Sequence, residues 1–368
     1  MKIILLTSSL MAGGAQRVAT TLCNAWAIRG DQVSLIPTFS GGGEPFYKIS
    51  DEVELIYLAD VVNIKKKSLS SHAQRLLALR RLIVERQPDI VISFLPNVNV
   101  AAIMASAFLR IPLIICERND PSIEPQPKLE KFACWLTYRY ADMLTVQTDV
   151  VAEKVMQIYP GLKKIRSIAN PLPDGVVAIK KSRSNKQRKI LLSLGRLDRQ
   201  KQVNLIINAF AGVVPRFEEW DLHIYGDGPL KVELEEQIRN LGLQGCVFLK
   251  GNTTEPWQIM AGADAFLMAS KYEGFPNSLL EAMGVGLPCV TFDCPSGPRE
   301  ITNNGKYAML VKLDDQNGLI TALEKIMSDE NFGIELGNQA RASILDRYRL
   351  SAVLDIWDQL FREVGVSI

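Results

Sequence analysis

Short apolar, β-branched runs alternate with helical segments along the whole chain of 368 residues, and this alternation constrains its fold most strongly. It predicts parallel strands connected by crossover helices. The first series of expected strands covers residues 3–8, 32–37, 90–94, 113–116 and 143–146, and the second covers 190–193, 222–225, 246–249, 265–268 and 288–292. Each series opens with a lysine, a buried strand and a glycine turn, from Lys2 to Gly13 and from Lys189 to Gly195. The sequence therefore predicts an α/β protein with two doubly wound domains.

A stretch rich in proline, glycine and charge separates the two series and indicates a domain boundary. It consists of residues 168–175 and the basic run 180–189. We expect domains over 1–170 and 171–350, followed by a C-terminal helix over 351–368. The apolar side of that helix contains Val353, Leu354, Trp357, Leu360 and Phe361. Its simplest role is to pack on the second domain, and packing back toward the first is the alternative.

The composition indicates a soluble globular protein, with 47% hydrophobic and 22% charged residues. A net charge of +2 carries no signal for nucleic acid. The six cysteines form no CxxC pair or zinc spacing, so we expect reduced cysteines in a cytoplasmic protein. The apolar N-terminal run fits a first strand better than a signal peptide, and no apolar stretch is long enough to span a bilayer.

Two carboxylates, Glu273 and Glu281, flank a turn and the start of an apolar helix. Glycine and proline form the turn, and Asn277 or Ser278 is expected to cap the helix. Backbone N–H groups at a helix N-terminus favour an anion. This arrangement suits a sugar nucleotide, with one carboxylate on the hexose, the other on the ribose and the N–H groups on the diphosphate. The alternative is a capped surface helix with two solvated acids.

Four segments together resemble glycosyltransferase family 4, whose members are retaining enzymes of the GT-B fold. They are Gly13 and Gly14 with the residues that follow, 194–201, 225–229, and 273–286. The resemblance implies two Rossmann-like domains that face a central cleft, where ligands bind at the carboxyl ends of the strands. It also implies that the first domain binds the acceptor and the second binds the nucleotide sugar.

The resemblance implies catalytic roles for Arg196, Lys201 and Glu273, with the two cations holding the donor diphosphate. The donor-binding residues that it implies are Gly13, Gly14, Phe248, Lys250, Gly274, Phe275, Pro276, Asn277, Ser278 and Glu281. Each role has a structural alternative. Arg196 and Lys201 could be a solvated pair of cations, Gly13 and Gly14 an ordinary turn, and Phe248 a core residue. Asp227 is interpreted as a turn residue.

No Asp-x-Asp motif occurs, so we expect no metal and no cofactor. Retention of configuration requires either a double displacement, with Glu273 as the nucleophile, or attack from the same face. Same-face attack fits the family better, because there the matching carboxylate contacts the outer hydroxyls of the sugar. The leaving diphosphate then accepts the proton of the acceptor, and Arg196 and Lys201 stabilise its charge.

A basic helical stretch in the first domain points to the acceptor. It includes Lys65, Lys66, Lys67, Arg75, Arg80 and Arg81, and further cations and aromatic residues occur over 128–138. Cationic helices beside apolar surface suit an anionic membrane and a lipid-linked diphosphate, and solvated helix faces are the alternative. Many relatives have a histidine where this chain has Arg118, so Glu117, Arg118 and Asn119 are also candidates for acceptor binding.

The organisation is similar to that of bacterial enzymes that add N-acetylgalactosamine to polyprenyl-diphosphate-linked glycans. We therefore expect transfer from a UDP-sugar, most simply UDP-GalNAc, with an α-linkage, in the assembly of O-antigen or lipid-linked oligosaccharide. UDP-Gal, UDP-Glc and UDP-GlcNAc fit the same motifs. A UDP-GlcNAc epimerase and a non-catalytic nucleotide-sugar-binding protein are the rival functions. The expected location is cytoplasmic, peripheral on the inner face of the cell membrane, with no nucleic-acid partner.

Overall fold

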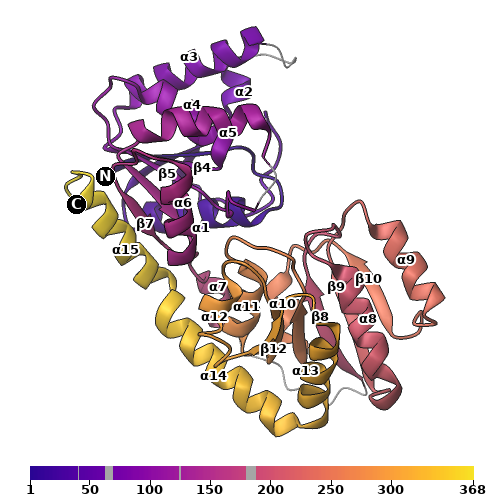
Figure 1. The fold of residues 1–368 in the computed structure, drawn as a ribbon. Coiled ribbons are helices and arrows are strands. Elements are labelled where there is room, and N and C mark those ends of the chain that lie inside the picture. The colour runs from indigo at the N-terminus through magenta and orange to yellow at the C-terminus, as the bar shows by residue number, and fades with distance from the viewer. Residues whose placement is uncertain (40, 63–68, 124–125, 180–187) are drawn as a thin grey trace. The chain divides into compact units, whose positions relative to one another are not determined.

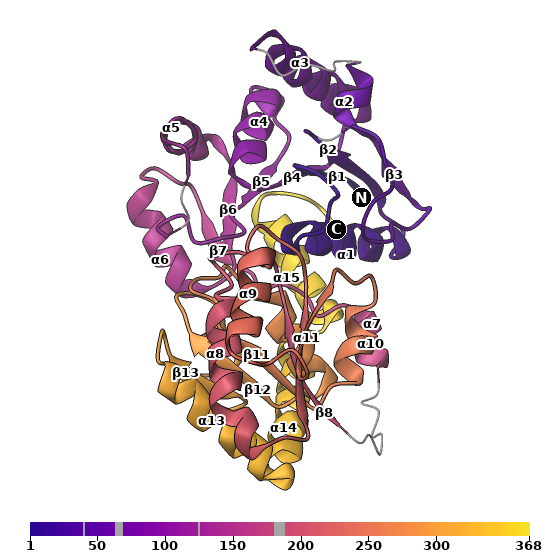
Figure 2. The ribbon, with the colours of Figure 1, turned by 90° about the vertical axis from the view of Figure 1, so that its right-hand side faces the viewer.

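The computed structural model describes all residues except 40, 63–68, 124–125 and 180–187. The chain forms two compact units, one made of Met1–Pro171 with Ser351–Ile368 and the other of Leu172–Leu350. Each unit is built around one parallel sheet, which confirms the predicted α/β fold class with two doubly wound domains (Figures 1 and 2). Lys65, Lys66, Lys67 and most of the basic run 180–189 lie outside the described residues.

The first unit contains a seven-stranded sheet with the order β3-β2-β1-β4-β5-β6-β7. The strands are β1 (Lys2–Thr7), β2 (Gln32–Pro37), β3 (Val53–Leu55), β4 (Ile90–Phe94), β5 (Leu113–Cys116), β6 (Met143–Val146) and β7 (Ile165–Ser167). The helices are α1 (Gly14–Ile28), α2 (Leu58–Val61), α3 (Leu69–Arg86), α4 (Pro96–Ser106), α5 (Lys128–Thr137), η1 (Tyr138–Tyr140), α6 (Asp149–Ile158) and α15 (Leu350–Glu363).

Both faces of the first sheet are covered, as the continuous apolar strands require. Ile3 and Leu5 point to the face packed by α1 and α15, whereas Ile4 and Leu6 point to the face packed by α3 to α6. Figure 2 shows these two groups of helices on opposite sides of the sheet.

The second unit contains a six-stranded sheet with the order β10-β9-β8-β11-β12-β13. The strands are β8 (Lys189–Leu194), β9 (Trp220–Tyr225), β10 (Val247–Gly251), β11 (Ala265–Met268), β12 (Cys289–Asp293) and β13 (Met309–Lys312). The helices are α7 (Asp174–Ala178), α8 (Val203–Val213), η2 (Val214–Arg216), α9 (Lys231–Asn240), α10 (Pro256–Ala261), α11 (Asn277–Val285), α12 (Pro298–Ile301), α13 (Gln316–Ser328) and α14 (Glu330–Tyr348).

All ten strands expected from the sequence occur, although several ends differ by one or two residues, as in β1, β9 and β10. The sequence did not predict β3, β7 or β13. These three short strands lie at sheet edges, and most of their side chains are not fully buried. They therefore lack the continuous apolar run that marks a central parallel strand.

Helix α15 packs in the core of the first unit rather than on the second. Trp357 meets Trp26 of α1 in an edge-to-face contact with ring centroids 5.7 Å apart, and Phe361 lies at the same distance from Trp26. Val353 and Leu360 join the same core cluster. The amphipathic pattern identified the helix and its apolar face, but only the tertiary contacts identify its partner.

Candidate functional site

The loop after β8 carries Arg196 and Lys201. The Arg196 side chain is 70% exposed and pairs with Asp198 at 3.0 Å. Lys201 lies in the loop that precedes α8, which begins at Val203. The carboxylate of Asp198 accepts hydrogen bonds from the backbone N–H groups of Gln200 and Lys201 at 3.0 and 3.1 Å, which fixes this turn.

Lys201 and Glu273 form an ion pair, with Nζ 2.5 Å from Oε1 and side chains that are 20% and 8% exposed. Two further hydrogen bonds join their segments, from Gln200 Nε2 to the Tyr272 carbonyl at 2.9 Å and from Lys271 N to the Gln200 carbonyl at 2.8 Å. The segments follow β8 and β11, which are neighbours in the sheet. The fold thus brings a predicted catalytic carboxylate and lysine together at the carboxyl ends of adjacent strands.

Two glycines of the segment after β9 support the Arg196 loop. A Cβ atom at Gly226 would lie 1.9 Å from the Gly195 carbonyl oxygen, and one at Gly228 would lie 2.5 Å from that of Leu197. Leu197 N in turn donates to the Asp227 carbonyl at 3.0 Å. The Asp227 side chain accepts from Gly228 N at 2.8 Å, as a turn residue would. The segment with Gly226 and Gly228 therefore supports the Arg196 loop through close backbone packing.

Helix α11 starts at Asn277, with Pro276 as its N-cap residue. The N-cap expected at Asn277 or Ser278 is therefore wrong, because Pro276 occupies that position. The turn before the helix is supported by the loop after β12, because Ser296 Oγ donates to the Gly274 carbonyl at 2.8 Å. Gly297 packs so closely that an added Cβ would meet Pro276 Cδ at 2.5 Å. The start of a helix of this length suits an anionic ligand.

Glu281, within α11, is 1% exposed. Its carboxylate accepts a hydrogen bond at 3.1 Å from Nε1 of Trp257, which lies in α10. The Trp257 ring also packs on Gly175, where an added Cβ would lie 2.2 Å from a ring carbon. No local sequence pattern links Trp257 to Glu281, so this contact could not be predicted from the sequence. The second carboxylate is thus held in one orientation.

Phe248 and Lys250 lie in β10, two strands away from β8 in the sheet order. The Phe248 ring meets His223 of β9 edge-on, with centroids 5.4 Å apart, and Lys250 Nζ lies 4.6 Å from the Phe248 centroid. Phe248 is half-buried, so it is neither a core residue nor fully exposed.

In the first unit, Gly13 is the N-cap of α1 and Gly14 its first residue. Gly13 N donates to the Tyr47 hydroxyl at 3.2 Å. The φ angle of Gly13 is 175°, an extended conformation that any residue adopts. The backbone angle therefore does not require a glycine here, but a Cβ atom added at Gly13 would clash with Gln16 Oε1 of α1.

Glu117 follows β5 and is 2% exposed. It accepts a hydrogen bond from the Tyr138 hydroxyl, which in turn accepts one from Asn99 Nδ2 at 3.1 Å. Asn99 Oδ1 accepts from Ser93 Oγ at 2.7 Å. Tyr138 was expected among the aromatic residues of the basic surface over 128–138, but it is buried, because its hydroxyl joins this hydrogen-bonded network. No local sequence pattern links Asn99 to Glu117. Arg118 is also buried, whereas Asn119 is half-buried.

The three arginines expected to meet the acceptor lie on α3, in different surroundings. Arg80 donates to the carbonyls of Ala105 and Ala107 at 2.9 and 2.8 Å, at the C-terminal end of α4. Arg75 is half-buried, and Arg81 is exposed. Arg80 thus has a structural partner, which cations commonly find at helix C-termini.

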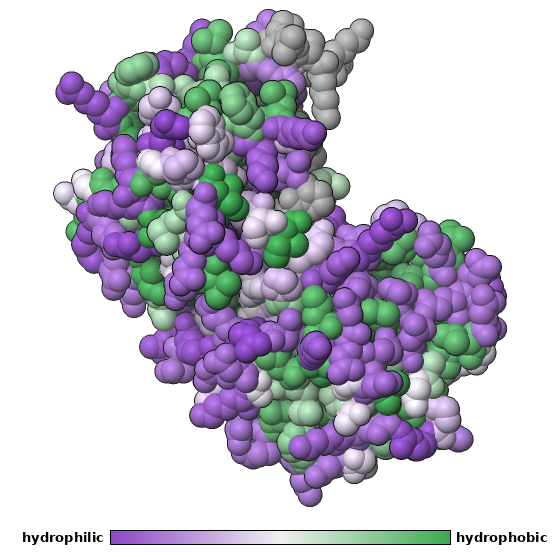
Figure 3. All heavy atoms as spheres, in the orientation of Figure 1, coloured by the Kyte–Doolittle hydropathy of each residue, from purple (hydrophilic) through white to green (hydrophobic). Residues whose placement is uncertain are grey.

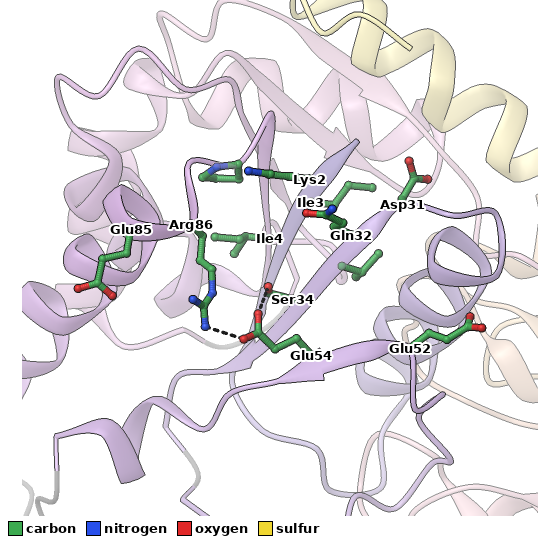
Figure 4. Close-up of a pocket in the computed structure, with 12 residues that line it drawn as sticks. Lys2, Ile3, Ile4, Asp31, Gln32, Ser34, Glu52, Glu54, Glu85 and Arg86 are labelled. Atoms are coloured by element: carbon green, nitrogen blue, oxygen red, sulfur yellow. Dashed lines mark hydrogen bonds and ion pairs between the residues drawn. The ribbon is translucent and has the colours of Figure 1, made fainter.

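A cavity of about 400 Å³ lies at the opposite, amino-terminal ends of β1 and β2 (Figure 4). Four of its twelve lining residues are acidic, and one of them, Glu54, accepts hydrogen bonds from Ser34 at 2.8 Å and from Arg86 at 2.5 Å. Ligands of doubly wound sheets bind at the carboxyl ends of the strands, so this cavity is not the candidate site. Within the described residues, no group of three or more His, Cys, Asp or Glu side chains could hold a metal ion.

Two family models match the chain. The model described as Glycosyltransferase Family 4 matches residues 12–174, and the one described as Glycosyl transferases group 1 matches 177–343. A Campylobacter jejuni protein is 29% identical over 99% of both chains. It is the GalNAc-alpha-(1->4)-GalNAc-alpha-(1->3)-diNAcBac-PP-undecaprenol alpha-1,4-N-acetyl-D-galactosaminyltransferase. A second Campylobacter jejuni protein, N-acetylgalactosamine-N,N'-diacetylbacillosaminyl-diphospho-undecaprenol 4-alpha-N-acetylgalactosaminyltransferase, is 27% identical over 93% of this chain and 95% of that one.

Solved structures agree in fold. TarM from S. aureus superposes with a TM-score of 0.82 at 14% identity, covering 98% of this chain. Sucrose-phosphate synthase from Thermosynechococcus elongatus gives 0.85 at 16% identity, covering 99% of each chain. These similarities show the GT-B fold.

Proposed function

The chain belongs to glycosyltransferase family 4, and from that premise we propose that it transfers N-acetylgalactosamine from UDP-GalNAc to a polyprenyl-diphosphate-linked glycan. The product would carry an α-linkage and serve the assembly of O-antigen or lipid-linked oligosaccharide. The proposal is supported by the two Campylobacter relatives, whose names state GalNAc transfer to glycans on undecaprenol diphosphate, and one of which aligns with this chain over nearly its full length.

The observation that carries the chemistry is the Lys201–Glu273 ion pair beside the Arg196 loop. Loss of a nucleoside diphosphate places negative charge on the leaving oxygen, and a fixed cation stabilises it by about 3 kcal/mol per contact. Lys201 and Arg196 supply two positive charges at the carboxyl end of β8. We assign them to the leaving diphosphate.

Glu273 has its Oε1 bound to Lys201, so its charge is already partly compensated. A carboxylate in that state is a poor nucleophile, which favours same-face attack over a double displacement. In the same-face reaction, the leaving diphosphate oxygen accepts the proton of the acceptor hydroxyl while the new glycosidic bond forms. Glu273 then orients Lys201 and contacts hydroxyls of the transferred sugar.

The donor's other contacts follow from the same unit. The backbone N–H groups of residues 274–278, around the start of α11, are assigned to the diphosphate, and buried Glu281 is assigned to the ribose hydroxyls. Phe248 and Lys250 of β10 are assigned to the base. Gly13 and Gly14 are assigned to the donor phosphates from the first unit, and Arg75, Arg81, Glu117 and Asn119 to the acceptor.

Helix α5 supports peripheral membrane association. Its exposed face, continued into η1, holds large apolar side chains that are between 41% and 80% exposed: Leu129, Phe132, Trp135, Leu136 and Tyr140. Phe132 and Trp135 stack at 6.0 Å, and exposed Lys128 and Lys131 accompany them. Aromatic and cationic side chains together suit an anionic lipid surface. None of the helices within the described residues is long and apolar enough to cross a membrane.

The test is UDP release by the purified protein in EDTA, with UDP-GalNAc, UDP-GlcNAc, UDP-Gal and UDP-Glc in turn. Each donor is assayed with and without a short-chain polyprenyl-diphosphate acceptor that carries GalNAc. We expect acceptor-dependent release with UDP-GalNAc, and an α-linkage by NMR of the product. Acceptor-dependent UDP release with only one of the other donors would identify that donor's sugar, instead of GalNAc, as the one transferred. Binding of UDP without any release would support a non-catalytic nucleotide-sugar-binding protein.

A further inference from the structure

Arg118 is the most deeply buried arginine of the first unit, at 6% exposure. It follows β5 at the carboxyl end of the sheet. Its guanidinium lies over the ring of Phe94, the last residue of the neighbouring strand β4, with Cζ 4.5 Å from the ring centroid. Arg118 is therefore fixed at the sheet edge where doubly wound folds bind their ligands.

The charge of Arg118 has no acidic counterpart among the described residues. Its Nη2 donates to Asn170 Oδ1, a neutral amide oxygen that also accepts from Gln147 Nε2 at 2.9 Å. Its Nε is buried and has no hydrogen-bond partner. By contrast, the buried carboxylate of Asp120, two residues further on, pairs with Lys154 at 2.8 Å.

A buried charge without a counter-ion opposes folding, and an apolar side chain of similar volume would avoid this cost. Burial lowers the pKa of Arg118 to about 10, so the group remains charged at neutral pH. The backbone directly after Phe94, whose ring lies under Arg118, is also strained, since Leu95 has a φ of 83°. Strain of this kind persists mainly at binding sites. Both features would be unfavourable in a site that served packing alone.

We propose that Arg118 binds a diphosphate group at the carboxyl ends of β4 and β5, with Asn170 and Gln147 holding its guanidinium in place. A planar guanidinium binds phosphate oxygens through two parallel hydrogen bonds. The inference rests on the proposed function, which involves two diphosphates, one on the donor and one on the lipid-linked acceptor.

Two variants test the role without relying on turnover. Arg118→Met removes the charge and keeps an unbranched apolar chain over Phe94. Asn170→Asp places a carboxylate on the guanidinium and neutralises it inside the protein. Arg362→Met, at an exposed arginine of α15 in the same unit, is the matched control. Binding of geranyl diphosphate and of UDP is measured by calorimetry in EDTA, and the melting temperature is measured for every variant.

We expect both variants to melt at or above the wild-type temperature and to bind one of the two probes at least about tenfold more weakly, the effect of losing one charge-assisted contact. Weaker geranyl diphosphate binding identifies the acceptor diphosphate, and weaker UDP binding identifies the donor diphosphate. Unchanged affinity for both probes, or no binding of either by the wild type, would overturn the inference. Because no transfer is measured, the result stands even if the transferase proposal fails.

Discussion

At the scale of single residues, two glycines determine the path of the loop that carries Arg196. Gly226 has a φ of 139°, which side chains rarely tolerate, and its Cα faces the Gly195 carbonyl. The pattern of glycines was visible in the sequence as part of the family resemblance. The reason for it is steric and became evident only from the packing of the segment after β9 on the loop after β8.

Gly226→Ala should destabilise the second unit by about 3 kcal/mol, since it adds backbone strain to a clash. Gly242→Ala is the control, because Gly242 also has a positive φ of 69° but no atom within 4 Å of an added Cβ. That change should cost about 1 kcal/mol. Urea denaturation measures the free energy of unfolding of both variants. Equal losses of this free energy would show that the contact between Gly226 and Gly195 has no effect on stability.

Lys201→Met should lower kcat by roughly a hundredfold, because it removes a cation from the developing charge of the leaving group. Arg196→Ala should act in the same direction. Glu273→Gln should also lower kcat, since it leaves Lys201 without its partner. Stopped transfer assays at saturating UDP-GalNAc measure these effects. Wild-type turnover in all three variants would remove the assignment of the site.

Glu281→Ala should weaken UDP binding by about tenfold, the typical loss for a hydrogen bond to a charged group. Glu281→Gln should retain the acceptor for Trp257 and lose less. Glu236→Ala, at an exposed position of α9, serves as control. Calorimetric titration with UDP measures the change, and an affinity equal to the wild type would place Glu281 outside the donor site.

At the scale of elements, α15 shows how one helix can be identified without its partner. The spacing of its apolar residues predicts which face of the helix is buried. That spacing does not indicate which apolar surface the face packs against. Its place in the core of the first unit depends on Trp26, which lies more than three hundred residues earlier. The same limit applies to α3, whose Arg80 reaches the end of α4.

Trp357→Ala should destabilise the first unit by about 3–5 kcal/mol, because it leaves a large cavity against Trp26. Ile356→Ala, the adjacent residue at 37% exposure, should cost less than about 1 kcal/mol. Urea denaturation distinguishes them. A small loss for Trp357→Ala would mean that α15 adds little to the core.

At the scale of the whole molecule, exposed apolar residues are not spread evenly. Figure 3 shows apolar residues among hydrophilic ones over the helices at the top of the view, where Figure 1 labels α3 and α4. Leu77 of α3 is 67% exposed, and Phe108 after α4 is 99% exposed. Most exposed large apolar side chains among the described residues lie in this first unit, which also carries the face of α5 that we propose for the membrane.

Replacing Phe132 and Trp135 with serine should reduce binding to vesicles containing phosphatidylglycerol by roughly tenfold, because aromatic side chains anchor interfacial helices. Val232→Ser on α9, where the valine is 70% exposed, is the control. Cosedimentation at low and high salt measures the effect. Equal binding of all variants would leave α5 as an ordinary solvated face.

The sequence by itself determined the fold class, ten of the thirteen described strands and the glycine and carboxylate motifs, because period and turn chemistry are local properties of a chain. It also located Glu273, Lys201 and Arg118, as residues of chemical interest. Only the tertiary structure decided which side chains meet. Lys201 and Glu273 are 72 positions apart, and the partners Trp257 of Glu281 and Tyr138 of Glu117 had no local signal. Such pairs arise because parallel strands bring distant loops to one edge of a sheet, and no short-range pattern records which loops those are.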